Sequence, residues 1–177
     1  MKRREFITLI GGGATAWPLK AHAQQPMARI GVMLAFSASD PEAKPFVAAL
    51  KKGVQDLGWI EGSNIEFDFR WPAADPDRIR AYATELVDTK PSAILVNSTA
   101  ATAALQQKTL TVPVVFVNIA DPIRSGFVAS LAAPGGNITG FTNFETTMGA
   151  KWLQLLRDVA PERIRAGLLF NPNIHPS

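Results

Sequence analysis

The sequence contains no cysteine, and its two histidines, His22 and His175, lie near the ends of the chain. The missing cysteine excludes a disulfide framework, a thiolate metal site, a cysteine nucleophile and a lipid-modified cysteine anchor. The body of the chain has no evident general base to activate a serine, and neither a Gly-x-Ser-x-Gly nor a His-Glu-x-x-His motif occurs. We therefore expect no enzyme, no metal and no cofactor.

The body of the chain also lacks an excess of charge of either sign. The sequence has 18 Lys and Arg against 15 Asp and Glu, but four of the basic residues and one acidic residue precede residue 24. The remainder is balanced, so the sequence pI near 9.4 reflects the N-terminal segment. A nucleic-acid-binding domain needs a basic face. We therefore expect no nucleic acid partner.

Residues 1–23 resemble an export signal. Arg3 and Arg4 precede a Phe-Ile pair, which is typical of twin-arginine signals, although an ordinary secretory signal is the alternative. Ala21 and Ala23 give the small-x-small pattern that signal peptidase recognises. The apolar stretch is shorter than the roughly 20 residues of a membrane-spanning helix. We expect cleavage near Ala23, export from the cytoplasm and no membrane span in the mature chain.

Beyond the leader, strand patterns and helix patterns alternate. Short apolar runs predict buried strands, and the period-two pattern of 65–71 predicts an edge strand. Asp40 and Asp75, each followed by proline, are expected to begin two of the helices, and Gly58 to end the first. The alternation predicts a doubly wound parallel α/β sheet. The expected strands are 30–36, 65–71, 93–96, 112–117, 138–141 and 164–170; the later helices are 98–108, 123–132 and 146–159.

Polar residues gather where three of the predicted strands end. Ligands of doubly wound sheets bind at the carboxyl ends of the strands. The amides that begin the helix after Ser98 could take a carboxylate, Asp121 an ammonium group, and Phe36 an apolar group. This arrangement predicts a site for a small zwitterionic solute. The candidate ligand-binding residues are Phe36, Ser37, Asn97, Ser98, Thr99, Asn118 and Asp121.

Each candidate also has a purely structural interpretation. Asn97 and Asn118 could satisfy backbone groups where strands turn into loops. Ser98 could be only the cap of its helix, and Asp121, which precedes proline, could be a turn device. Phe36 could belong to the core. The residues alone leave these alternatives open.

Several motifs together resemble a known family. They are the leader with its Gln-Gln-Pro ending, Gly53-x4-Gly58-x3-Gly62-x-Asn64, Asp121-Pro122, Pro134-Gly135-Gly136-Asn137-Ile138-Thr139-Gly140 and Phe170-Asn171-Pro172. The set resembles the substrate-binding proteins of ABC transporters, in the branch linked to tryptophan and tyrosine. The resemblance implies a type I periplasmic-binding-protein fold, whose two lobes close on a solute. It also implies a periplasmic location, a membrane permease as partner and a monomeric protein.

The resemblance further implies how the chain is divided. Residues 24–142 match a complete first lobe, whereas residues 143–177 match a crossover, one helix and the first strand of a second lobe that is mostly missing. Family members are about twice as long, so we expect weak or no solute binding by this chain. Two alternatives are a ligand-sensing lobe of a receptor and, as a third class, a flavodoxin-like enzyme.

Overall fold

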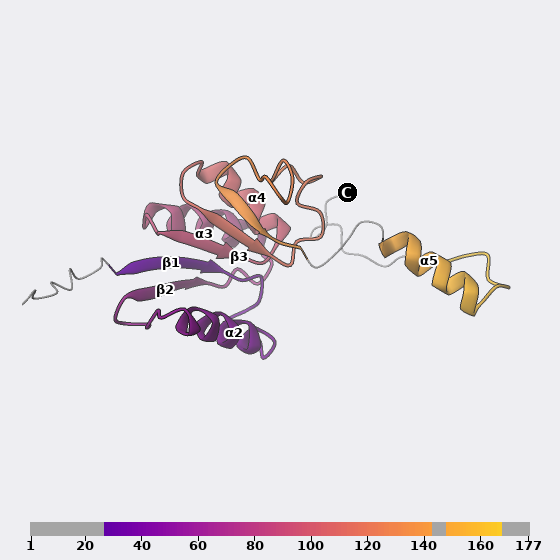
Figure 1. Ribbon diagram of the computed structural model, residues 1–177, viewed down its shortest axis with the longest axis horizontal. Coiled ribbons are helices and arrows are strands. Elements are labelled where there is room, and N and C mark those ends of the chain that lie inside the picture. Colours follow the sequence, from indigo (N-terminus) through magenta and orange to yellow (C-terminus); the bar gives the residue numbers. More distant parts are fainter. Residues whose placement is uncertain (1–26, 143–147, 168–177) are drawn as a thin grey trace, which may run out of the picture.

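The computed structural model describes residues 27–142 and 148–167 (Figure 1). Strands and helices alternate along the chain except between the fourth and fifth strands, which are joined by turns. No helix in these ranges is long and apolar enough to cross a membrane. The elements are β1 (Ala28–Met33), α2 (Ala43–Asp56), β2 (Ile65–Arg70), α3 (Pro76–Asp88), β3 (Ala93–Val96), α4 (Thr99–Lys108), β4 (Val114–Val117), β5 (Ile138–Phe141) and α5 (Met148–Val159).

The five strands form one parallel sheet in the order β2-β1-β3-β4-β5. The strand β2 lies at one edge, which agrees with its period-two sequence, and β5 lies at the other. Because all strands are parallel, their carboxyl ends meet at one edge of the sheet. The predicted doubly wound parallel sheet is confirmed.

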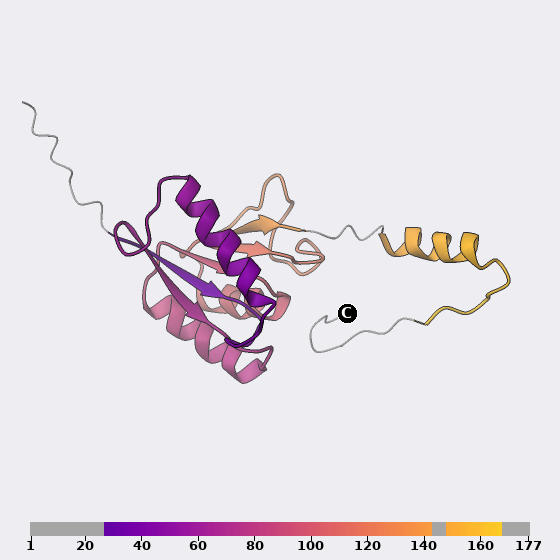
Figure 2. The same ribbon diagram turned by 90° about the horizontal axis from the view of Figure 1, so that it is seen from below.

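Helices cover the two faces of the sheet unequally. Figures 1 and 2 show α2 on one face, with α3 and α4 on the other. Neighbouring residues of β2 show the same division: Lys51 of α2 lies over the Phe69 ring, whereas Arg70 bonds to Glu85 of α3. This arrangement follows from right-handed crossovers, because the chain moves one way from β1 to β2 and the other way thereafter.

The main core lies between the sheet and the α3–α4 layer. Glycine at position 31 lets α3 approach closely, because a Cβ there would lie 3.1 Å from a methyl carbon of Leu86. On this face, apolar side chains of the strands and of both helices form one cluster. Its largest fully buried members are Met33, Leu86, Ile94, Leu105, Phe116 and Ile119.

Local signals set most of the helix ends. The Asp75 carboxylate caps α3 by accepting from the backbone N–H groups of Asp77 and Arg78, and Pro76 occupies the first turn. Gly58 follows α2 with φ +87°, the left-handed conformation that ends a helix. The carboxylate of Asp40 bonds to the Glu42 N–H in the turn before α2, so it does not cap the helix itself.

Two predicted elements differ from the structure. The helix expected at 123–132 is wrong: residues 122–126 form turns, and Gly126 has φ +72°. The Pro122 carbonyl accepts from Phe127 N–H, which closes the turn and buries the Phe127 ring. Residues 164–167 are not a strand, while the rest of the strand expected at 164–170 lies outside the described residues. The predicted leader, 1–23, also lies outside them.

Candidate functional site

The order of the strands brings three of the predicted ligand loops to one edge of the sheet. The strands β1, β3 and β4 are consecutive neighbours, and Phe36, Asn97 and Asn118 follow their carboxyl ends. This is where open parallel sheets bind ligands. The structure therefore places together the loops that the sequence singled out, while the role of each residue in binding stays a prediction.

Asn97 is a buried polar residue in the middle of this edge. The residue is 7% exposed, and its Oδ1 accepts a hydrogen bond of 2.7 Å from the Ala35 N–H. The bond joins the end of β3 to the loop after β1, where the regular ladder between the two strands has finished. Part of the Asn97 side chain thus has the structural role that was the alternative to ligand binding.

The first turn of α4 starts directly after Asn97. Ser98 is the N-cap, and its Oγ accepts from the Ala101 N–H at 3.2 Å. The Thr102 N–H and hydroxyl both donate to the Ser98 carbonyl. The N–H groups of Thr99 and Ala100 have no acceptor in the described part of the chain. They lie at the positive end of the α4 dipole, so this turn can accept an anionic group.

The loop after β1 places an aromatic ring at the carboxyl edge of the sheet. The Phe36 ring packs against Phe46 of α2, with ring centroids 5.3 Å apart, and both rings remain partly exposed. The Ser37 hydroxyl lies 3.3 Å from that of Ser39. The Phe36 carbonyl accepts from Ala73 N–H after β2, which anchors the loop on its other side.

Phe46 and Ala73 are contributors to this edge that the sequence prediction missed. Phe46 belongs to the apolar stripe of α2, so its periodicity suggested core packing only. Its position at the start of the helix that follows β1 is the signal that could have placed it near the site. Nothing in the sequence pairs Ala73 with Phe36, because their bond depends on how far β2 extends.

The loop after β4 is shaped by its backbone. Asn118 adopts the left-handed conformation, with φ +62°, and its N–H donates to the Phe141 carbonyl at 3.2 Å. The Asp121 carboxylate accepts from the backbone N–H of Arg124, three residues later, at 2.9 Å, and so stabilises the turn that follows it. Asp121 therefore has the predicted structural role. Its carboxylate remains half-buried and retains acceptor capacity for an ammonium group.

The charges near the end of β2 are already paired. Burial lowers the pKa of Arg70, but hydrogen bonds to Glu85 and Asp68 outweigh this effect and raise it. The Arg70 guanidinium also lies 5.9 Å from the centre of the Tyr82 ring. It is committed to these neighbours rather than to a solute. Within residues 27–142 and 148–167, no cluster of acidic or histidine side chains is suited to hold a metal.

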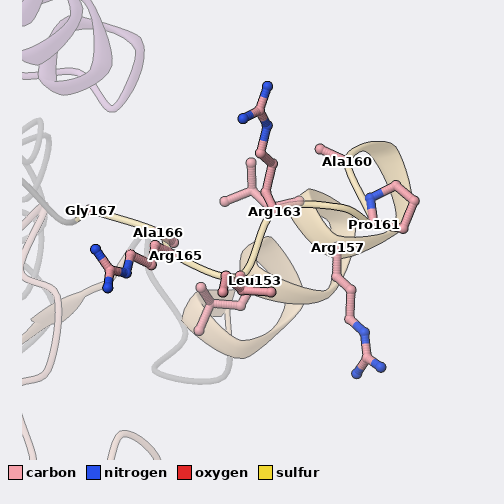
Figure 3. A pocket seen from close by; sticks show the side chains of 10 residues that line it. Leu153, Arg157, Ala160, Pro161, Arg163, Arg165, Ala166 and Gly167 are labelled. Atoms are coloured by element: carbon pink, nitrogen blue, oxygen red, sulfur yellow. The ribbon is translucent and has the colours of Figure 1, made fainter.

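A separate hollow of about 900 Å³ lies between α5 and the segment that follows it (Figure 3). Leu153, Leu156 and Ile164 give it apolar walls, while the Arg157 and Arg163 side chains extend away from it. Its lining residues are almost all exposed. The hollow is thus an uncovered apolar face and is distinct from the carboxyl edge of the sheet.

The fold and this edge define a class of protein, the α/β lobes that hold small solutes at strand ends. Residues 30–177 match the family described as ABC transporter substrate binding protein. The chain belongs to the ABC transporter substrate-binding protein family.

Individual relatives agree with this assignment. A tyrosine-binding protein of Clostridioides difficile (strain R20291) is 30% identical over 132 residues, which are 75% of this chain and 36% of that protein. The Streptococcus pneumoniae ABC domain solved in complex with L-Trp is 25% identical, with a TM-score of 0.66 over 77% of this chain and 44% of that one.

An open, ligand-free substrate-binding protein with adhesive properties from Clostridium difficile is 26% identical, with a TM-score of 0.64 over 77% of this chain and 45% of that one. The chain therefore spans less than half the length of these relatives.

Proposed function

We propose that this chain forms the first lobe of an extracytoplasmic, periplasmic solute-binding protein, which captures an amino acid and delivers it to the permease of an ABC importer. The observation that carries the proposal is that β1, β3 and β4 are neighbours in a parallel sheet, so the loops that follow them lie at the edge of the sheet where α4 begins. Membership of the substrate-binding family and the tyrosine- and tryptophan-binding relatives support it. The lobe binds the solute and makes or breaks no bond.

An amino acid would use the chemistry of all three loops. Its carboxylate would accept from the N–H groups of Thr99 and Ala100 in the first turn of α4, where the helix dipole favours negative charge. The Asp121 carboxylate would pair with its ammonium group. The Phe36 and Phe46 rings would contact an apolar or aromatic side chain. Ser37, Asn97, Ser98 and Asn118 complete the proposed contact set.

We further propose that residues 24–142 form the first lobe and residues 143–177 begin a second one. The uncovered apolar face of α5 supports this division, because such a face needs another layer against it. A solute at the edge of a single sheet is enclosed on one side only. We therefore expect weak binding by this chain, with a dissociation constant in the range of about 1 mM, or near −4 kcal/mol.

An NMR titration of residues 24–177 tests the proposal. L-tryptophan is compared with tryptamine, which lacks the carboxylate, and with indole-3-propionate, which lacks the ammonium group. The Thr99 and Ala100 amide signals should shift with the two carboxylates and not with tryptamine. If tryptophan, tyrosine and a panel of other amino acids leave the signals of all three loops unchanged at 20-fold the expected dissociation constant (about 20 mM), the proposed function is wrong.

A further inference from the structure

The two ends of the Asn97 amide are in different situations. Its Oδ1 bonds to Ala35 N–H, and the residue as a whole is 7% exposed. Every fully enclosed side-chain nitrogen or oxygen in the described ranges has a hydrogen-bond partner. The Asn97 Nδ2 has none among these residues, so it must lie in the small part of the side chain that solvent reaches.

The assignment of the two ends follows from the chemistry of the partner. A backbone N–H can only donate, so the atom facing Ala35 has to be the carbonyl oxygen of the amide. The NH2 group then lies on the other branch of the planar amide. Ser98, the N-cap of α4, is the next residue along the chain. The NH2 group and the N–H groups of Thr99 and Ala100 are therefore donors at the same strand end.

We propose that Asn97 sets the selectivity of the site for solutes that present a carboxylate: its Oδ1 positions the β1 loop, and its Nδ2 donates to the carboxylate oxygen. This inference rests on the proposed function and deepens it. Burial and the bond from Ala35 N–H to Oδ1 restrain the amide, so its NH2 group loses little freedom when a solute binds. The bond to Ala35 also fixes Phe36, the next residue, relative to the carboxylate site.

Two substitutions separate the two roles. Asn97→Asp keeps an acceptor for Ala35 N–H but replaces the donor by a negatively charged oxygen, which repels a carboxylate. Asn97→Leu has a similar volume and provides neither group. Asn64→Asp is the matched control for added charge, because the Asn64 Oδ1 likewise accepts from a backbone N–H, that of Ile60, in the turn before β2.

The experiment measures amide hydrogen exchange at Ala35 and NMR titration with indole-3-propionate in residues 24–177. Asn97→Asp should retain the slow exchange of Ala35 and weaken binding about tenfold to a hundredfold, the usual range for a hydrogen bond to a charged group. Asn97→Leu should weaken binding and also accelerate Ala35 exchange at least tenfold. Asn64→Asp should match the wild type in both measurements.

The outcomes distinguish this inference from the function on which it rests. Wild-type affinity in Asn97→Asp would show that Nδ2 does not contact the carboxylate, and would overturn the inference while the proposed function stands. Unchanged Ala35 exchange in Asn97→Leu would overturn the positioning role. A wild-type chain that binds neither indole-3-propionate nor an amino acid would overturn the proposed function and the donor role together.

Discussion

The helices α3 and α5 carry the same kind of apolar stripe, but only one of them buries it. In α3, Ile79, Ala83 and Leu86 face the sheet and are buried. In α5, Leu155 and Leu156 are more than half exposed, and no residue of the helix is buried. Figures 1 and 2 show α5 standing apart from the sheet. An amphipathic sequence thus indicates that a helix needs a covering layer, without indicating which layer it is.

This difference has an energetic consequence. A helix of 12 residues is marginally stable in water on its own, because the cost of nucleation is offset only by packing of its apolar face. The sheet and α3 stabilise each other, whereas α5 receives little from either. The free energy of unfolding should therefore come almost entirely from residues 27–142.

The largest expected effect comes from one substitution made in both helices. Leu86→Ala removes a fully buried side chain of α3 and should lower the free energy of unfolding by about 2–5 kcal/mol, because it leaves a cavity in the core. Leu156→Ala, at a position 56% exposed in α5, should change it by less than about 0.5 kcal/mol. Urea unfolding followed by circular dichroism measures both. Equal losses would contradict the comparison.

A smaller effect is expected at the edge of the sheet beside β5. A Cβ on Gly140 would lie 2.6 Å from Cγ of the Phe116 ring and closer still to the Phe116 carbonyl oxygen. Gly140→Ala should therefore cost about 1–3 kcal/mol through overpacking. Gly136→Ala, four residues earlier, meets no atom within 4 Å and serves as the control. If thermal unfolding showed Gly140→Ala to be as stable as the control, β5 would not pack as closely against Phe116 of β4 as the structure shows.

These contrasts also show which features the sequence could predict. Short continuous apolar runs are typical of strands inside a parallel sheet, so β3 and β4 could be predicted, and the alternation of strands and helices predicted that the sheet is parallel. The 123–132 segment also has helical spacing, but it forms a turn in which the Pro122 carbonyl accepts from Phe127 N–H and Gly126 has φ +72°. Local hydrogen bonds and one left-handed residue thus override the helical periodicity of the segment.

The candidate site was predictable as a place and less so as a set of roles. A parallel sheet places its strand ends at one edge, and β1, β3 and β4 are neighbours in this sheet. Whether an asparagine at a strand end bonds to backbone or to solute depends on distances that the sequence does not contain. Asn137 illustrates this point: within the family motif, its Nδ2 donates to the carbonyls of Thr109 and Val112 and joins two loops.

A third prediction concerns how the stability that the α3 cap contributes depends on pH. Backbone hydrogen bonds from Arg78 and Asp77 lower the pKa of Asp75, against the opposing effect of desolvation. A carboxyl whose pKa is lowered on folding stabilises the protein above its ordinary pKa, near 3.8, and this contribution is lost as pH falls through the lowered value. Asp75→Asn can still cap the helix without titrating.

The melting temperature of this variant should accordingly be close to that of the wild type at pH 7 and fall less steeply between pH 5 and pH 2, a window set by the lowered pKa. Glu66→Gln, in the exposed pair with Arg29, is the control. A wild type and an Asp75→Asn variant with parallel acid profiles would exclude this contribution.

The smallest effect is expected when α5 is removed altogether. A chain that ends at Thr142 loses every apolar residue of α5 and of the hollow beside it, yet loses no member of the main core. Its free energy of unfolding should stay within about 0.5 kcal/mol of that of the longer chain, as for changes at a surface. Its tendency to self-associate should fall, because the uncovered apolar face of α5 is gone. A substantial loss of stability on this truncation would mean that α5 packs against the sheet in solution, and the contrast between the two helices would then no longer hold.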